Sequence, residues 1–177
     1  MMFVGPSFKY KNCDRIISAF YQFIKNVDDE YLLCFVGGSL KYKNYLKEFI
    51  KNNYFDMENQ VVFMEYLKSE EVSWMYKNAV CLLITTLYEG FGIPALEAML
   101  NNCPVIASNT SSLPEVCGDA SLMVNPELID EIAVAMTRIT NDLLFRDELL
   151  KKGRENVKRF GWDKTANCVY NVISKHI

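Results

Sequence analysis

Histidine is almost missing from this chain of 177 residues, because its one histidine is His176, next to the C-terminal residue. Catalysis of the Ser-His-Asp and Cys-His kinds and histidine-rich metal sites need histidine among their groups. The sequence therefore excludes these chemistries within the chain. An excess of positive charge is missing too, since the formal net charge is -3. This balance argues against a nucleic-acid-binding protein, which neutralises phosphates with a basic face.

Long apolar runs are also missing, and none approaches the roughly 18 residues that a bilayer crossing requires. The first residues read directly as a strand and a turn, without a signal-peptide pattern. The six cysteines are scattered and form no Cys-x-x-Cys pair, which disfavours a zinc site or a disulfide framework. Buried, reduced thiols in a cytoplasmic protein explain them best. They are Cys13, Cys34, Cys81, Cys103, Cys117 and Cys168.

What is present is an ordinary globular balance, with 50% hydrophobic and 23% charged residues over the length of one domain. Short apolar runs alternate with segments of helical periodicity, which predicts right-handed βαβ units. The expected fold is α/β, a Rossmann-like three-layer α/β/α domain over residues 1–177 with a six-stranded parallel sheet. The predicted strands cover 2–4, 32–36, 61–64, 80–84, 105–107 and 122–124. The predicted helices cover 13–27, 42–53, 70–77, 127–139, 142–160 and 164–175, with another from Pro94 and a short one between Ser112 and Gly118, where Ser112 and Glu115 form a capping box.

Two glutamates eight residues apart, Glu89 and Glu97, flank a glycine-rich turn that leads into a predicted helix. Glu89 follows the carboxyl end of a buried strand, where open α/β sheets bind their ligands. Gly90 and Gly92 permit tight backbone angles, and Pro94 suits the first helical turn. The free N–H groups of that turn form an anion site, and helical side chains lean back toward it, Glu97 included. Two carboxylates that accept hydrogen bonds thus flank a phosphate-sized group of N–H donors. This arrangement suits a nucleotide sugar, which has hydroxyls at both ends and phosphates in the middle.

The segment 88–99 resembles the Glu-x7-Glu motif of the retaining glycosyltransferases of family 4 type, which have the GT-B fold. Segments 101–108 and 111–120, and 3–5 with Lys11 and Asn12, extend the resemblance over nearly the whole chain. The resemblance implies transfer of a hexosyl group, with mannosyl favoured, from a nucleotide-diphosphate sugar to a glycan or lipid-linked acceptor with retention. It implies no metal cofactor, and the sequence has no Asp-x-Asp triplet that would suggest one.

The resemblance also implies roles for single residues. Glu89 would contact hydroxyls of the transferred sugar, Glu97 would bind both ribose hydroxyls, and Lys11 would meet the diphosphate. Glu89 and Lys11 are thus the candidate catalytic residues. The candidate donor-binding residues are Glu97, Gly5, Lys9, Gly90, Phe91, Gly92 and Ile93, and Phe91 is equally well explained by packing.

The chain departs from the family pattern at two places. The arginine that usually follows the glycine matching Gly5 is Pro6 here, and Lys9 is either its replacement or a solvated surface lysine. Glu65 stands where the family commonly has glycine near the base, and it either alters the base preference or points to water. The turn 37–39 is a further strand-end turn, with or without a ligand.

GT-B enzymes have two Rossmann-like halves, and this chain resembles only the C-terminal, donor-binding one. We therefore expect that an N-terminal acceptor half is missing and that the chain is inactive without it. Peripheral binding to the inner face of the membrane, through that half, stays open. Aromatic residues of the C-terminal helices are expected in the core or between the halves: Phe145, Phe160, Trp162 and Tyr170. The alternative is a catalytically silent nucleotide-sugar-binding module or split-enzyme subunit. A phosphorylase of the same fold fits less well, since no pyridoxal phosphate lysine context is present. A sugar-nucleotide epimerase fits the long Glu-x7-Glu resemblance less well.

Overall fold

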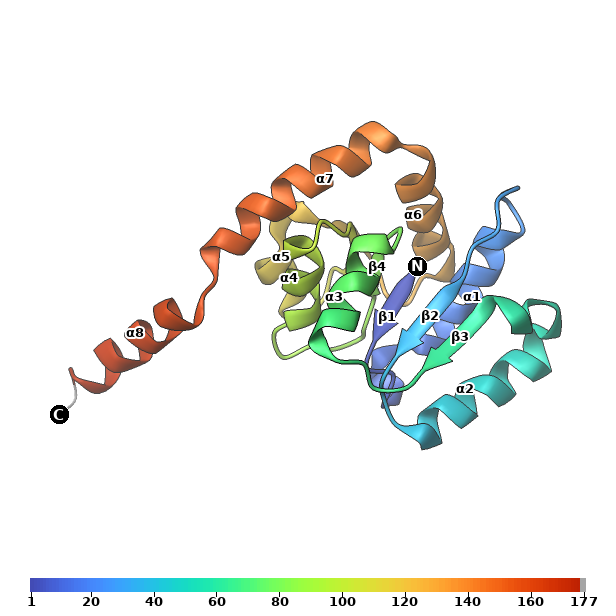
Figure 1. Ribbon diagram of the computed structural model, residues 1–177, viewed down its shortest axis with the longest axis horizontal. Coiled ribbons are helices and arrows are strands. Elements are labelled where there is room, and N and C mark those ends of the chain that lie inside the picture. Colours follow the sequence, from blue (N-terminus) through green and yellow to red (C-terminus); the bar gives the residue numbers. More distant parts are fainter. Residues whose placement is uncertain (176–177) are drawn as a thin grey trace.

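The computed structural model describes residues 1–175, in which six strands form one parallel sheet with helices on both faces (Figure 1). The strand order β3-β2-β1-β4-β5-β6 confirms the predicted six-stranded parallel sheet and the Rossmann-like α/β class. His176 lies outside the described residues. The strands are β1 (Met2–Val4), β2 (Leu33–Val36), β3 (Val61–Met64), β4 (Leu82–Ile84), β5 (Val105–Ser108) and β6 (Leu122–Val124).

The helices alternate with the strands as predicted, with ends that shift by a few residues. The longest predicted helix ends earlier, at Asn156, and a 3-10 turn follows it. The α-helices are α1 (Cys13–Ile24), α2 (Leu40–Asn53), α3 (Ser69–Asn78), α4 (Ile93–Leu100), α5 (Leu113–Cys117), α6 (Ile129–Asn141), α7 (Leu143–Asn156) and α8 (Trp162–Ile173). The 3-10 turns are η1 (Lys9–Lys11), η2 (Phe55–Gln60), η3 (Gly118–Ala120) and η4 (Val157–Arg159).

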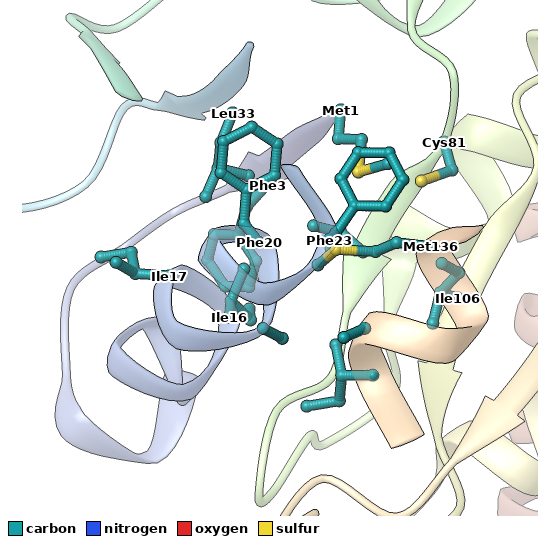
Figure 2. Packing of buried hydrophobic residues seen from close by; sticks show 14 of the residues in the cluster. Met1, Phe3, Ile16, Ile17, Phe20, Phe23, Leu33, Cys81, Ile106 and Met136 are labelled. Carbon is teal, nitrogen blue, oxygen red and sulfur yellow. The ribbon is translucent and has the colours of Figure 1, made fainter. Parts of the chain in front are cut away.

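The core is divided into two apolar clusters, one on each face of the sheet, because successive strand residues point to opposite faces. Phe3 of β1 belongs to the cluster under α1, α2 and α6, while its neighbour Met2 belongs to the cluster under α3, α4 and α5. Figure 2 shows Phe3 in the same cluster as Phe20 and Phe23 of α1. Strands that are buried on both faces explain the continuous apolar runs in the sequence.

The cysteines have no disulfide partner within the part of the chain that the structure describes. Four of them are buried, and burial raises the pKa of the Cys81 and Cys117 thiols to about 11. These thiols therefore stay protonated near neutral pH and pack as small apolar side chains.

Helix α8 differs from the other helices because it projects from the body of the molecule (Figure 1) and buries none of its residues. Phe145 and Phe160 pack against the two apolar clusters. The expectation of core packing is wrong for Trp162 and Tyr170. They are 81% and 69% exposed, because α8 has no neighbouring element to cover them. Over residues 1–175, no helix combines the length and apolar character that a membrane crossing would need.

Candidate functional site

The winding of the sheet changes direction between β1 and β4, which are neighbours in the centre of the strand order. Helix α1 after β1 covers one face of the sheet, and α4 after β4 covers the other. Ligands of open α/β sheets bind at such a switch point, outside the carboxyl ends of the strands. The loops that follow β1 and β4 carry most of the predicted site residues.

Lys11 and Glu89 meet at this switch point. The Lys11 Nζ donates to Glu89 Oε1 at 2.7 Å, across 78 residues of sequence. Their side chains are only 19% and 13% exposed, so the pair is shielded more than an ordinary surface ion pair. The sequence placed these two residues at one site, but it did not predict their direct contact.

The basic loop after β1 begins at Gly5, whose left-handed backbone (φ 75°) turns the chain while its N–H donates to Val36 O at 2.9 Å. Lys11 then lies in the 3-10 turn η1. Lys9 is exposed on the same turn, so both alternatives for it stand. The turn 37–39 packs against this loop: a Cβ at Gly38 would lie 2.2 Å from Pro6 O, which accounts for glycine there without a ligand.

Two serines after β5 hold the backbone of Glu89. The Ser111 hydroxyl accepts from the Glu89 N–H at 3.1 Å and donates to the Glu89 carbonyl, and the Ser112 hydroxyl donates to the same carbonyl at 2.9 Å. The predicted capping box of Ser112 and Glu115 is therefore wrong, because Ser112 has helical backbone angles and its hydroxyl is engaged by Glu89. No pattern in the sequence signals these contacts between two separate loops.

The turn before α4 depends on Gly92 rather than on Gly90. Gly92 has φ 99°, and a Cβ there would lie 2.5 Å from Leu113 Cδ2, whereas a Cβ at Gly90 meets nothing within 4 Å. Pro94 lies in the first turn of α4, as predicted. Phe91 packs edge-on against Phe160 with ring centroids 5.7 Å apart and is 44% exposed, so packing and donor contact both stand as roles for it. The start of α4 offers backbone N–H groups to an anion.

Glu97 lies on the exposed side of α4, with Ile93 one turn earlier on the same helix. The buried Tyr76 of α3 donates its hydroxyl to Glu97 Oε2 at 3.1 Å. Burial, with the nearby Glu97 carboxylate, raises the pKa of Tyr76 far above its usual range, so the phenol remains a donor. Tyr76 orients this carboxylate; the sequence analysis missed it, because it reads as one more aromatic residue on a helix face.

Glu65 points to water, with a side chain that is 86% exposed, and it also contacts a buried lysine. The Lys43 side chain is 3% exposed, and its Nζ donates to Glu65 Oε1 at 2.9 Å and to Met64 O at 3.3 Å. A buried ammonium group needs such partners, because removing it from water is costly. Glu65 therefore neutralises Lys43 at the carboxyl end of β3.

Replacement of Glu65 by alanine is expected to lower the free energy of unfolding by about 1–3 kcal/mol, because it leaves the Lys43 charge without its carboxylate. Urea unfolding of the variant and the parent chain measures this loss. The double variant Lys43→Met/Glu65→Ala is expected to lose less than Glu65→Ala alone, since no charge stays buried. Equal losses in the two variants would contradict the neutralising role.

A metal centre has no obvious ligand set here. Within residues 1–175, no group of three or more histidine, cysteine, aspartate or glutamate side chains is arranged to hold a metal ion. The groups at the switch point that carry positive charge are Lys11, paired with Glu89, and the first N–H groups of α4.

Known proteins resemble this chain in sequence and in fold. The sequence model of the family described as "Glycosyl transferases group 1" matches residues 1–159. The O-antigen chain mannosyltransferase B of Escherichia coli is 34% identical over 119 residues, which cover 67% of this chain and 30% of that protein. The chain thus spans less than a third of that relative.

Solved structures share this fold, and one of them is a glycosyl transferase domain. The C-terminal domain of a group 1 glycosyl transferase from Francisella tularensis has a TM-score of 0.76 at 25% identity, covering 89% of this chain and 84% of that chain. An Anabaena protein crystallised with UDP and glucose has a TM-score of 0.84 at 19% identity, covering 98% of this chain and 47% of that chain. The chain is thus similar in extent to the first and to about half of the second.

Proposed function

From its membership of the group 1 glycosyl transferase family, we propose that this chain is the donor-binding half of a retaining, metal-independent glycosyltransferase of family 4 type. Glu89 and Glu97 would form its Glu-x7-Glu motif. The observation that carries the proposal is the Lys11–Glu89 pair at the switch point, beside the open start of α4. The pair supports the proposal because it joins a cation, which a phosphate would need, to a hydroxyl acceptor, which a sugar would need.

The chemistry follows from the charges of the site. The bond between the anomeric carbon and the diphosphate oxygen breaks, the diphosphate leaves with the bonding electron pair, and Lys11 with the first N–H groups of α4 stabilises its negative charge. Glu89 accepts hydrogen bonds from the sugar hydroxyls, and Glu97, oriented by Tyr76, accepts from the two ribose hydroxyls. A short-lived ion pair then keeps the diphosphate on one face of the sugar. The acceptor hydroxyl bonds to the anomeric carbon on that same face and its proton passes to the leaving diphosphate, so the anomeric configuration is kept. The protein groups supply this stabilisation in place of a metal.

A mannosyl group is favoured as the transferred group, and a glycan or a lipid-linked molecule is the proposed acceptor. The mannosyl preference is supported by the Escherichia coli relative, whose name describes a mannosyltransferase of an O-antigen chain. The Anabaena structure, with UDP and glucose, supports a nucleotide-sugar donor in general.

An N-terminal half is the proposed partner, and transfer would need it. The chain spans 47% of the Anabaena chain, and α8 presents an uncovered apolar side with Trp162, Val169 and Tyr170. Exposed apolar faces of this kind mark contact with another surface. Peripheral membrane binding, where it occurs, would come through the partner half.

The proposal is tested by calorimetric titration of the chain with GDP, UDP, ADP, dTDP and their sugars. One nucleotide is expected to bind selectively. Glu97→Ala is expected to lower its affinity about tenfold or more, because a charged hydrogen bond contributes about 1.5–3 kcal/mol. The folded chain binding none of them would contradict a self-sufficient donor site. Selective binding without transfer, even after an N-terminal half is added, would favour a catalytically silent binding module.

A further inference from the structure

Asn12, directly after Lys11, is a fully buried residue in the basic loop. Its side-chain amide donates to Thr85 O at 2.8 Å and to Pro126 O at 2.7 Å, and its Oδ1 accepts from Arg15 Nη1 at 2.9 Å. Both donors of the carboxamide are therefore used, each by a backbone carbonyl of a different loop. The loop after β1 is joined in this way to the loops after β4 and β6.

A second tether lies on the other side of Lys11. The Leu87 N–H donates to Tyr10 O at 2.8 Å. Tyr10 and Asn12 flank Lys11, and their partners Leu87 and Thr85 precede Glu89 by two and four residues. The two tethers thus connect the loop of Lys11 to the segment that leads to Glu89, on both sides of the ion pair.

The backbone of Asn12 also suits this task. Its left-handed angles (φ 61°, ψ 26°) are tolerated by asparagine and glycine better than by most residues, so the loop can turn into α1 here. A lysine side chain has many rotamers, and its distance from a carboxylate depends on how the two backbones are placed. Fixing the two loops therefore fixes where the Lys11 ammonium group lies.

We propose that Asn12 is a positioning residue that sets Lys11 against Glu89 and so prepares the site for the diphosphate of a nucleotide. The ligand in this statement rests on the proposed function, whereas the placement of Lys11 does not. Asn12 acts through Lys11 and does not touch the ligand itself.

The chain contains a matched control in Asn156, which is 8% exposed at the end of α7. Its amide donates to Val116 O at 2.9 Å, and its Oδ1 accepts from Arg159 Nη1, three residues later, as Asn12 accepts from Arg15. Loss of either carboxamide costs buried hydrogen bonds, but only Asn12 adjoins the Lys11–Glu89 pair.

The first test needs no ligand. The coupling between Lys11→Met and Glu89→Gln is measured by urea unfolding in a double-mutant cycle, in the parent chain and in the Asn12→Gly and Asn156→Ala backgrounds. Glycine keeps the left-handed angles at position 12, and alanine suits the helical end at 156. The coupling is expected to vanish only with Asn12→Gly. Its survival there, its absence from the parent chain or its equal loss with Asn156→Ala would overturn the proposal.

The second test titrates the parent chain with GDP, UDP, ADP and dTDP, and the same variants with the nucleotide that it binds. Asn12→Gly is expected to lower the affinity for the nucleoside diphosphate about tenfold, and Asn156→Ala is expected to lower it less than twofold, because only the first displaces a charged contact. Should Asn12→Gly not fold, Asn12→Asp keeps the volume and the Arg15 bond while removing both donated bonds. A parent chain that binds none of the four nucleotides contradicts a self-sufficient donor site, and the unfolding cycle then decides on Asn12 alone.

Discussion

Replacing Lys11 with alanine is expected to lower the affinity for a nucleoside diphosphate by about 10- to 100-fold. The change removes the ammonium group at the switch point and leaves Glu89, 13% exposed, without its ion-pair partner. The uncompensated carboxylate then repels the incoming phosphates. Affinity for the matching nucleoside without phosphates is expected to change little, since no phosphate contact is lost.

Calorimetric titration of the two ligands separates this electrostatic loss from a general loss of structure. Lys9→Ala is the matched control, because Lys9 lies on the same 3-10 turn and has the same charge. A small effect of Lys9→Ala identifies Lys9 as a solvated lysine, whereas a comparable effect identifies it as the second cation of the site. An equal loss of diphosphate and nucleoside binding in Lys11→Ala would contradict a phosphate contact.

Gly92→Ala is expected to lower the free energy of unfolding by about 2–5 kcal/mol and to abolish nucleotide binding. Left-handed angles cost a non-glycine residue about 1–2 kcal/mol, and overpacking costs about 1–3 kcal/mol more. Both apply at this position, where φ is 99° and the new Cβ would lie 2.5 Å from Leu113 Cδ2. A relaxed turn would also re-aim the N–H groups at the start of α4.

Urea unfolding and nucleotide titration measure the two parts of this effect. Gly90→Ala is the control, because a Cβ there meets nothing within 4 Å, and it is expected to leave stability nearly unchanged. Leu113→Ala should relieve part of the additional loss caused by Gly92→Ala, since it removes the clash but not the backbone strain. Similar stability of the Gly90 and Gly92 variants would show that the turn tolerates a side chain.

The fold was largely predictable because its signals are local. Buried parallel strands require continuous apolar runs, and the helices between them require apolar residues at helical spacing. The Glu89–Glu97 segment was recognisable for the same reason, since its strand end, glycine turn and helix start are contiguous. The strand bounds at Val61–Met64 and Leu122–Val124 agree with the prediction residue for residue.

The contacts within the site were not predictable because they join residues far apart in the sequence. Nothing near Lys11 indicates that its ammonium group reaches Glu89, and nothing near Ser112 indicates that its hydroxyl serves another loop rather than its own helix. The role of Glu65 was hidden in the same way, because its partner Lys43 looks like a surface lysine until α2 is placed against the sheet. Tertiary packing decides each of these.

Because α8 projects from the body of the molecule, the fluorescence of a tryptophan on it reports whether the helix is covered. The sequence has two tryptophans, and Trp162 at the start of α8 is 81% exposed. An indole in water emits at long wavelength, and any surface that covers this helix would shift its emission to the blue. The other tryptophan, Trp74 of α3, is 62% exposed and would contribute to the emission as well. Trp74→Phe would leave Trp162 as the only tryptophan, and its emission wavelength would then report whether α8 is covered.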